Sequence, residues 1–206
     1  MADPFTVSIS VFALFVSAAT AWLTLLRRGT VKMTRPTIIF FGPDSPRSHE
    51  EKPLPKIYLR TLLFATSKRG RIIESMHVSL TRNESHQNFS FWVYGRDKLE
   101  RGSGLFVGET GIAANHHFLT PNDGNSFEFL PGTYYLKVHA RLLGDSKQLL
   151  LFSQALDVSS EVAEAIKEPH TGLYFDWSPN SSCYLQHVDK HPRLPKTEHF
   201  YNLLPS

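Results

Sequence analysis

The chain has 206 residues, of which 41% are hydrophobic and 12% aromatic, so it carries enough apolar material to build a folded core. Its formal net charge of +3 at pH 7 is too small to indicate a nucleic-acid partner. A single cysteine, Cys183, excludes an intrachain disulfide and favours a reducing compartment.

The first feature along the chain is an uncharged run over residues 5–26, FTVSISVFALFVSAATAWLTLL. At about 1.5 Å per residue, a helix over this run crosses a hydrocarbon core of about 30 Å. Its polar residues are Ser and Thr, whose hydroxyls can bond to carbonyls of the same helix. We therefore predict one uncleaved transmembrane helix. A cleaved signal peptide and a buried core helix are the two alternatives.

Basic residues gather directly after this run, and none precedes it. The positive-inside rule then places the carboxyl-terminal side of the helix in the cytoplasm. Because cations near a bilayer are attracted to anionic headgroups, these residues and a later basic turn are candidate lipid contacts. They are Arg27, Arg28, Lys32 and Arg35 after the run, and Lys68, Arg69 and Arg71 in the turn.

The rest of the chain is typical of short strands separated by turns, with one short helix predicted at 160–167. The predicted strands are 37–41, 57–66, 72–81, 88–94, 105–107, 112–119, 133–142 and 149–158, with a strong turn at 121–125. A segment at 173–177 can add one more strand, and little regular structure is expected after about residue 190. These elements predict a tail and transmembrane helix over 1–28, a β-sandwich over 29–168 and a His- and Pro-rich tail over 169–206.

Alternation within the strands predicts which side chains face the core. Over 133–142 the core face holds Tyr134, Leu136, Val138 and Ala140. Over 88–94 it holds Phe89, Phe91 and Val93, which leaves Trp92 and Tyr94 on the opposite face. If that face is open, Trp92 and Tyr94 form an apolar patch for a protein partner.

The segment 129–140, FLPGTYYLKVHA, resembles the Pro-Gly-x-Tyr-x-Leu-x-Val strand of bacterial immunoglobulin-like modules. This resemblance implies an antiparallel immunoglobulin-like β-sandwich and no particular activity. The whole plan resembles uncharacterised single-span membrane proteins of bacteria, which implies a bacterial inner (plasma) membrane with the β domain on its cytoplasmic side.

The segment 102–118 resembles the region around the catalytic histidine of trypsin-like serine peptidases, which would make His117 a general base. That chemistry also needs an orienting carboxylate and an attacking serine. The nearest match to the nucleophile motif is Gly144-Asp145-Ser146, where Lys147 replaces the following glycine and the spacing from His117 is far too short. We interpret the resemblance as a decoy.

No metal or cofactor site is predicted. His116 and His117 are adjacent on a predicted strand, so their rings point to opposite faces and cannot share a metal. His187 and His191 have the i, i+4 spacing that suits a metal on a helix, but Pro192 argues against a helix there.

These observations favour a non-enzymatic interaction module that holds an unknown protein partner or assembly at the cytoplasmic face of the membrane. One alternative is a trypsin-like or metal-dependent hydrolase that uses His117. Another is a small subunit that joins a membrane complex through its span, where Ala13, Ser17 and Ala21 recur at every fourth position and would allow close helix approach.

Overall fold

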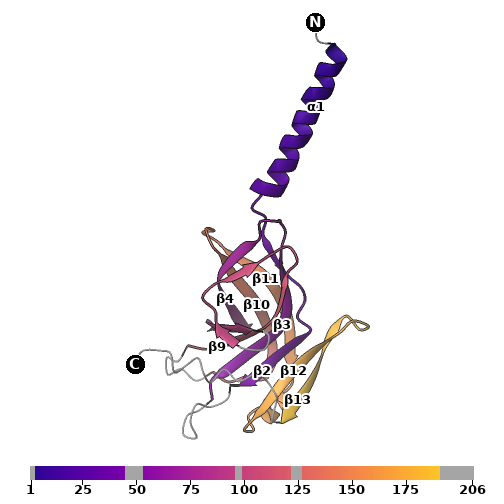
Figure 1. Cartoon of the computed structure of the whole chain (residues 1–206). Coiled ribbons are helices and arrows are strands. Elements are labelled where there is room, and N and C mark those ends of the chain that lie inside the picture. Colours follow the sequence, from indigo (N-terminus) through magenta and orange to yellow (C-terminus); the bar gives the residue numbers. More distant parts are fainter. Residues whose placement is uncertain (1–2, 45–52, 96–98, 122–126, 191–206) are drawn as a thin grey trace.

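One long helix projects from one end of a β domain in the computed structural model, which describes residues 3–44, 53–95, 99–121 and 127–190 (Figure 1). Helix α1 (Pro4–Ala21) continues as a π-helical turn over Trp22–Leu26. Its start is fixed by Pro4 in the first turn and by Asp3, whose Oδ1 accepts a hydrogen bond of 3.2 Å from the backbone N–H of Phe5. The segment Pro4–Thr24 is 21 residues long and is apolar enough to cross a membrane.

The surface of α1 agrees with this assignment. No residue of α1 is buried against the rest of the chain, so the prediction of a buried core helix, kept as an alternative, is wrong. The hydroxyls of Ser8, Ser10, Thr20 and Thr24 each donate to the carbonyl four residues earlier, at 2.7–2.9 Å. The predicted bonding of these hydroxyls within the helix is confirmed, and it leaves none of the four as an unsatisfied donor in lipid.

The β domain is built from two antiparallel sheets. Sheet A has the strand order β13-β12-β2-β3-β9-β6-β7, with β1 also paired to β3, and sheet B has the order β11-β10-β4-β5, with β8 also paired to β4. The strands are β1 (Val31–Met33), β2 (Ile38–Pro43), β3 (Pro55–Ala65), β4 (Arg71–Arg82), β5 (Ser85–Phe89), β6 (Phe91–Gly95), β7 (Leu99–Arg101), β8 (Leu105–Val107), β9 (Ile112–Leu119), β10 (Gly132–Leu142), β11 (Gln148–Val158), β12 (Thr171–Ser178) and β13 (Cys183–Lys190).

The mainly β prediction is confirmed, but the immunoglobulin-like arrangement is not. Sheets of eight and five described strands differ from the four and three strands of a constant-type immunoglobulin domain. The short helix is confirmed as α2 (Ser160–Ala165), where the Ser159 hydroxyl oxygen accepts a hydrogen bond of 3.2 Å from the N–H of Val162.

The main core lies between the two sheets and follows the predicted alternation. Tyr134, Leu136, Val138 and Ala140 of β10 are all buried in it, as predicted. Met76, Val78 and Leu80 of β4 lie directly opposite three of these positions on the neighbouring strand. Burying such apolar side chains contributes roughly 1.5–3 kcal/mol each, which makes this interface the main stabilising feature of the domain.

Sheet A is also buried at the centre of its outer face, which points away from sheet B. One cross-strand row there runs through Tyr174, Phe40, Tyr58, His117 and Val93, each opposite the next on adjacent strands. Apart from the half-buried Tyr174, these side chains are at most 5% exposed. Burial on both faces explains why β3 is a nearly continuous apolar run in the sequence.

The predicted strand 88–94 is two strands that belong to different sheets. β5 pairs with β4 in sheet B, β6 pairs with β9 in sheet A, and the chain passes between the sheets at Ser90. This crossing shifts the alternation by one residue, so Phe89 and Trp92 face the inter-sheet core whereas Phe91 does not. The predicted core face of this segment is therefore correct for Phe89 and wrong for Phe91, and Val93 is buried on the outer face of sheet A instead.

The predicted His- and Pro-rich tail over 169–206 begins with two strands of sheet A. The extra strand at 173–177 is confirmed as β12, which pairs with β2 and places Leu173 and Phe175 in the core. It forms a hairpin with β13, which the sequence did not predict. The β domain therefore continues to Lys190 rather than ending at 168. Residues 122–125 of the predicted turn and residues 191–206 of the tail lie outside the described residues.

Candidate functional site

The best-defined candidate site is the junction between the helix and the β domain. The linker 27–30 is bonded to the turn between β3 and β4. Ser67 Oγ donates to the carbonyl of Arg28 at 2.9 Å, and Arg71 Nη1 donates to the carbonyl of Gly29 at 3.1 Å. The N–H of Thr30 donates to Thr66 Oγ1 at 2.9 Å, and the N–H of Thr66 donates back to the Thr30 carbonyl at 2.8 Å. The chain is thus fixed to the domain within two residues of the helix end.

Gly29 makes this close approach possible. Its φ of +62° lies in the left-handed region, where residues with a side chain are strained. A Cβ at this position would lie 2.7 Å from both Cβ and Oγ of Ser67. The linker therefore needs glycine here for its backbone conformation and for its contact with the turn.

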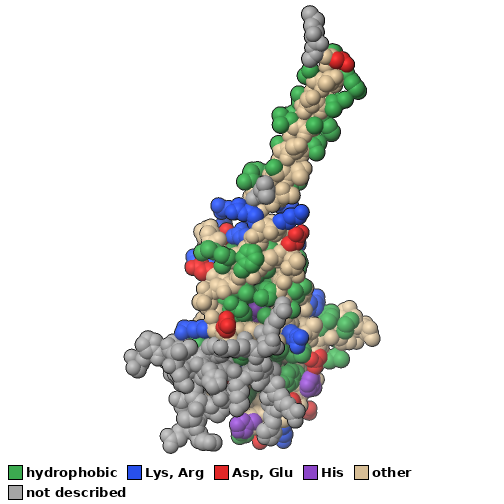
Figure 2. Space-filling view, in the orientation of Figure 1, with side chains coloured by type: hydrophobic (Ala, Val, Ile, Leu, Met, Phe, Trp, Pro, Cys, Tyr) green, Lys and Arg blue, Asp and Glu red, His purple; other side chains and the backbone are tan. Residues whose placement is uncertain are grey.

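The same contact assembles a group of cations from two distant parts of the sequence. Lys68 and Arg69 follow Ser67 on the β3–β4 turn and are exposed, as are Arg27 and Arg28 on the linker. Together with the exposed Lys32 on β1, they form what we call the basic collar. Figure 2 shows blue side chains on both sides of the chain where the helix meets the domain. The nearby turn 108–111 carries an exposed carboxylate, Glu109, and is held at this end by the N–H of Ala65, which donates to the carbonyl of Gly108. The described cations at this end still outnumber the exposed carboxylates.

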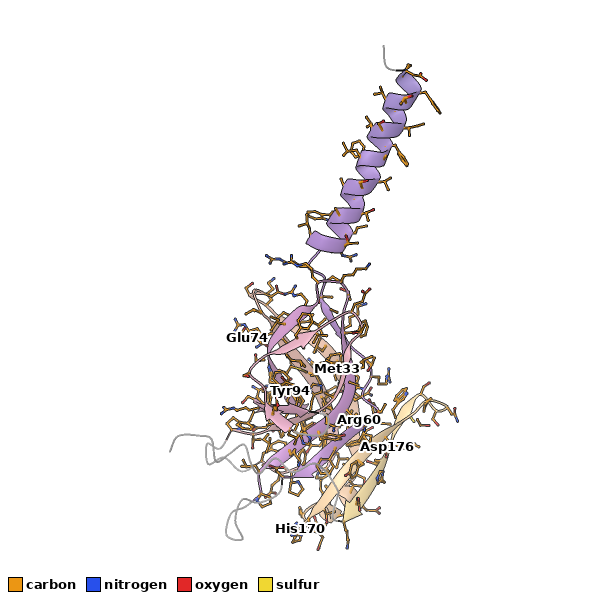
Figure 3. The ribbon with its side chains drawn as sticks, viewed as in Figure 1. Met33, Arg60, Glu74, Tyr94, His170 and Asp176 are labelled. Atoms are coloured by element: carbon orange, nitrogen blue, oxygen red, sulfur yellow. The ribbon has the colours of Figure 1, made fainter. Side chains whose placement is uncertain are left out.

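Two of the predicted lipid contacts are engaged elsewhere. Arg71 is largely buried, and its Nη2 lies 2.8 Å from Asp145 Oδ1 while Nη1 bonds the linker. The Arg35 guanidinium carbon lies 3.9 Å from the ring centroid of Trp177. Arg35 also lies close to a part of the domain that is away from the helix. Thr37, two residues later, donates its N–H to the carbonyl of Arg60, and Figure 3 shows Arg60 farther from the helix than Met33. These positions argue against Arg35 and Arg71 as headgroup contacts.

His116 and His117 point to opposite faces of β9, as predicted. His116 faces the core, where its Nδ1 accepts a hydrogen bond of 3.2 Å from Trp92 Nε1. His117 faces outward and packs on Tyr58, with ring centroids 4.9 Å apart. Burial lowers the pKa of His116 to about 4, and burial with the nearby charge of Lys56 lowers that of His117 to about 3. Both rings are therefore neutral near pH 7.

The partners that a hydrolase would need at His117 are not present among the described residues. Its Nδ1 and Nε2 are both buried without a hydrogen-bond partner. Asp145, the carboxylate of the predicted decoy motif, instead pairs with Arg71 at the helix-proximal end of the domain. A triad requires direct hydrogen bonds through both ring nitrogens, and the described geometry provides neither.

The proposed partner patch at Trp92 and Tyr94 is wrong in its premise of exposure. Trp92 is 4% exposed and belongs to the inter-sheet core, with its ring 4.8 Å from that of Tyr94. Tyr94 is half-buried, and its hydroxyl donates to the carbonyl of Gly104 at 2.9 Å. The shift in alternation at Ser90 is the physical reason that these residues face inward.

The described residues include no group of three or more His, Cys, Asp or Glu placed to hold a metal ion. His187 lies on a strand, where its ring stacks on Tyr174 at 5.1 Å and its Nδ1 lies 3.0 Å from Asp176 Oδ2. His191, the other histidine of the i, i+4 pair, is outside the described residues. His77 and His139 stack at 5.0 Å on the outer face of sheet B.

Another buried polar contact was not predicted. Lys56 Nζ lies 2.7 Å from Asp44 Oδ1, and both side chains are at most 3% exposed. The sequence around Lys56 does not indicate its partner, because Asp44 lies at the other end of the loop between β2 and β3. A buried pair of this kind holds the ends of β2 and β3 in one arrangement, and loss of the Asp44 carboxylate would remove the counter-charge of the buried Lys56 ammonium.

Two surfaces of the described domain expose large apolar side chains and are candidate binding surfaces. One is β13, an edge strand of sheet A in which Leu185 is 56% exposed. The other is a group of exposed apolar side chains near the junction, on β4, β8 and the β10–β11 turn.

Comparisons of the chain with protein-family models, curated proteins and solved structures find no match.

Proposed function

We propose that the protein is a non-enzymatic interaction module, anchored by one helix, that holds a protein partner at the cytoplasmic face of a bacterial inner membrane. The observation that carries this proposal is the bonded linker. An anchor on a long flexible tether lets a domain explore the solution. Here the domain begins four residues after the helix, which limits its separation from the bilayer to about 14 Å.

The charge at the junction supports the orientation in this proposal. The basic collar lies on the domain side of the helix, whereas the described residue before the helix, Asp3, is acidic. This asymmetry favours a cytoplasmic β domain by the positive-inside rule. Cations close to an anionic surface also add roughly 1 kcal/mol each of attraction, which would hold the domain near the headgroups.

We assign the partner-binding surface to the free edge of β13. Among the described strands, β13 has a neighbour, β12, on one side only, and the hairpin stands away from the domain (Figure 1). Natural edge strands are commonly protected by Lys, Pro or a bulge. β13 contains no Pro, its one Lys is the last residue, Lys190, and its pairing with β12 is regular. Such an edge can bind an extended segment of a partner as an added strand.

Crosslinking and co-purification of the full chain from native membranes tests this proposal. The chain is expected to recover a defined protein, and Leu185→Lys should reduce its recovery at least about tenfold, because a charge on an edge strand disfavours pairing. Leu130→Lys is the matched control, since Leu130 is also exposed but lies outside β13. Equal recovery by both variants would remove the edge of β13 from the proposal. Failure of the native chain to recover any protein would contradict the interaction function itself.

A further inference from the structure

Three large apolar side chains are exposed together beside the junction. Phe106 is 61% exposed, Leu143 57% and Ile72 40%. Ile72 lies opposite Phe106 on the adjacent strand, and the N–H of Leu143 donates to the carbonyl of Ile72 at 2.9 Å. Three strands or turns that are distant in sequence therefore contribute to one surface, which we call the apolar patch.

The apolar patch adjoins the basic collar. The Phe106 ring lies over Gly70, where a Cβ would come within 2.5 Å of its Cζ atom. Gly70 has a φ of +68° and closes the same turn that carries Lys68 and Arg69. Figure 2 shows hydrophobic side chains at the helix end of the domain, next to blue ones. The other side of the patch is polar, since Glu74 lies 3.9 Å from Arg141 there.

The position of the apolar patch indicates which surface it binds. Clustered exposed apolar side chains usually mark a binding surface. Here the nearest extended surface is the bilayer that holds α1, because the linker allows a separation of only about 14 Å. Apolar side chains flanked by Lys and Arg are the combination that binds the boundary between headgroups and acyl chains.

We propose that Ile72, Phe106 and Leu143 form a second membrane contact, which enters the interface of the same anionic bilayer while the basic collar binds its headgroups. This inference rests on the proposed anchoring by α1. It gives the domain a fixed orientation, with the helix-proximal end of sheet B against the lipid. The β12–β13 hairpin belongs to the other sheet and stays free for a partner.

Lipid quenching of single labels on the full chain tests the second contact. In a Cys183→Ser background, Phe106→Cys or Leu143→Cys is labelled with an environment-sensitive dye, and the protein is placed in phosphatidylcholine–phosphatidylglycerol vesicles that contain doxyl-labelled lipid. Both labels should show a blue-shifted emission and be quenched. Leu185→Cys is the matched control on β13 and should remain unquenched. Leu14→Cys lies within α1 and reports insertion of the span.

The outcomes separate this inference from the anchoring on which it rests. Quenching at 14 without quenching at 106 and 143 overturns the second contact and leaves the anchor intact. A blue shift at 106 that persists in detergent without lipid quenching indicates a protein contact and also overturns it. Absence of quenching at 14 contradicts the anchor and the second contact together.

The role of charge has its own pair of variants. Lys68→Gln/Arg69→Gln removes two cations from the basic collar, whereas Arg60→Gln/Lys137→Gln removes two exposed cations elsewhere on the domain. In the first variant the label at 106 should lose most of the extra quenching that anionic vesicles give over neutral ones. The second variant should keep it. Equal behaviour of the two variants would show that the collar does not guide the patch to the membrane.

Discussion

At the residue scale, the two adjacent histidines of β9 illustrate how burial decides chemistry. A histidine with a free ring nitrogen in a cleft can act as a base. His116 and His117 instead lie on the two faces of a central strand, and both are fully buried. Their lowered pKa values come first from that burial, which disfavours the charged form. They are features of the fold that should affect its stability more than any reaction.

The stability of the domain should therefore fall in mild acid. Well above pH 6.5, from about pH 7.5 upward, neither the folded nor the unfolded chain protonates these histidines to any extent, and they cause no pH dependence. Between pH 6.5 and about 4 these histidines bind protons in the unfolded chain and stay neutral in the folded chain. Each histidine then lowers the free energy of unfolding by up to about 1.4 kcal/mol per pH unit. Denaturant unfolding of the full chain in detergent, at several values between about pH 7 and 5, measures this slope.

The double variant His116→Leu/His117→Leu provides the comparison. Its slope should be shallower than that of the native chain by up to about 3 kcal/mol per pH unit. Some slope should remain, because burial also lowers the pKa of the partly exposed His77 and His139. Equal slopes in the two proteins would mean that the buried pair does not govern the acid response.

At the scale of elements, the linker is as important as the helix. Gly29→Ala introduces a Cβ at a left-handed backbone position and 2.7 Å from Ser67. We expect it to break the bonds between the linker and the β3–β4 turn at a cost of about 1–3 kcal/mol, while the sheets stay folded. A spin label on the linker, at Arg28→Cys in a Cys183→Ser background, should become more mobile in Gly29→Ala.

The control for this prediction is Gly144→Ala. Gly144 also has a positive φ, of +82°, but nothing lies within 4 Å of a Cβ there. It should strain its own turn and leave the label at Arg28 unchanged. If Gly29→Ala and the native protein give the same spectrum, the linker is not fixed to the domain in the way the structure implies.

The elements differ in how well the sequence predicts them, for physical reasons. β10 buries alternate residues against sheet A, so its period of two is plain in the sequence. β13 is an edge strand with mostly exposed residues on both faces, and it leaves no such pattern. The crossing at Ser90 shifts the inward-facing positions by one residue, and no local sequence pattern reveals this shift. Trp92 was therefore predicted on the surface but is buried in the core.

The candidate site was predictable only in part for a related reason. The cations directly after the helix can be proposed as lipid contacts from their place in the sequence alone, although the structure argues against Arg35. The participation of Lys68 and Arg69 depends on the antiparallel pairing of Val31 with Ala65, which brings the β3–β4 turn to the linker. The apolar patch depends on three separate elements that meet only in the folded domain, so single-strand patterns do not indicate it.

At the scale of the whole molecule, three features gather at one end. The basic collar and the apolar patch lie on elements next to the point where the chain leaves α1. The β12–β13 hairpin stands at the far edge of sheet A (Figure 1). This polarity suits a domain with one end for lipid and an exposed edge for a partner. Both proposed contacts therefore depend on the side of the membrane on which the domain lies.

Labelling of Cys183 reports which side of the membrane the domain occupies, because Cys183 is the chain's one cysteine and is exposed at the start of β13. A membrane-impermeant maleimide should leave the native chain unlabelled in intact cells and should label it after permeabilisation. In Cys183→Ser, an added Ala2→Cys before the span should show the opposite behaviour and be labelled in intact cells. Labelling of Cys183 before permeabilisation would place the β domain outside and contradict its proposed cytoplasmic position.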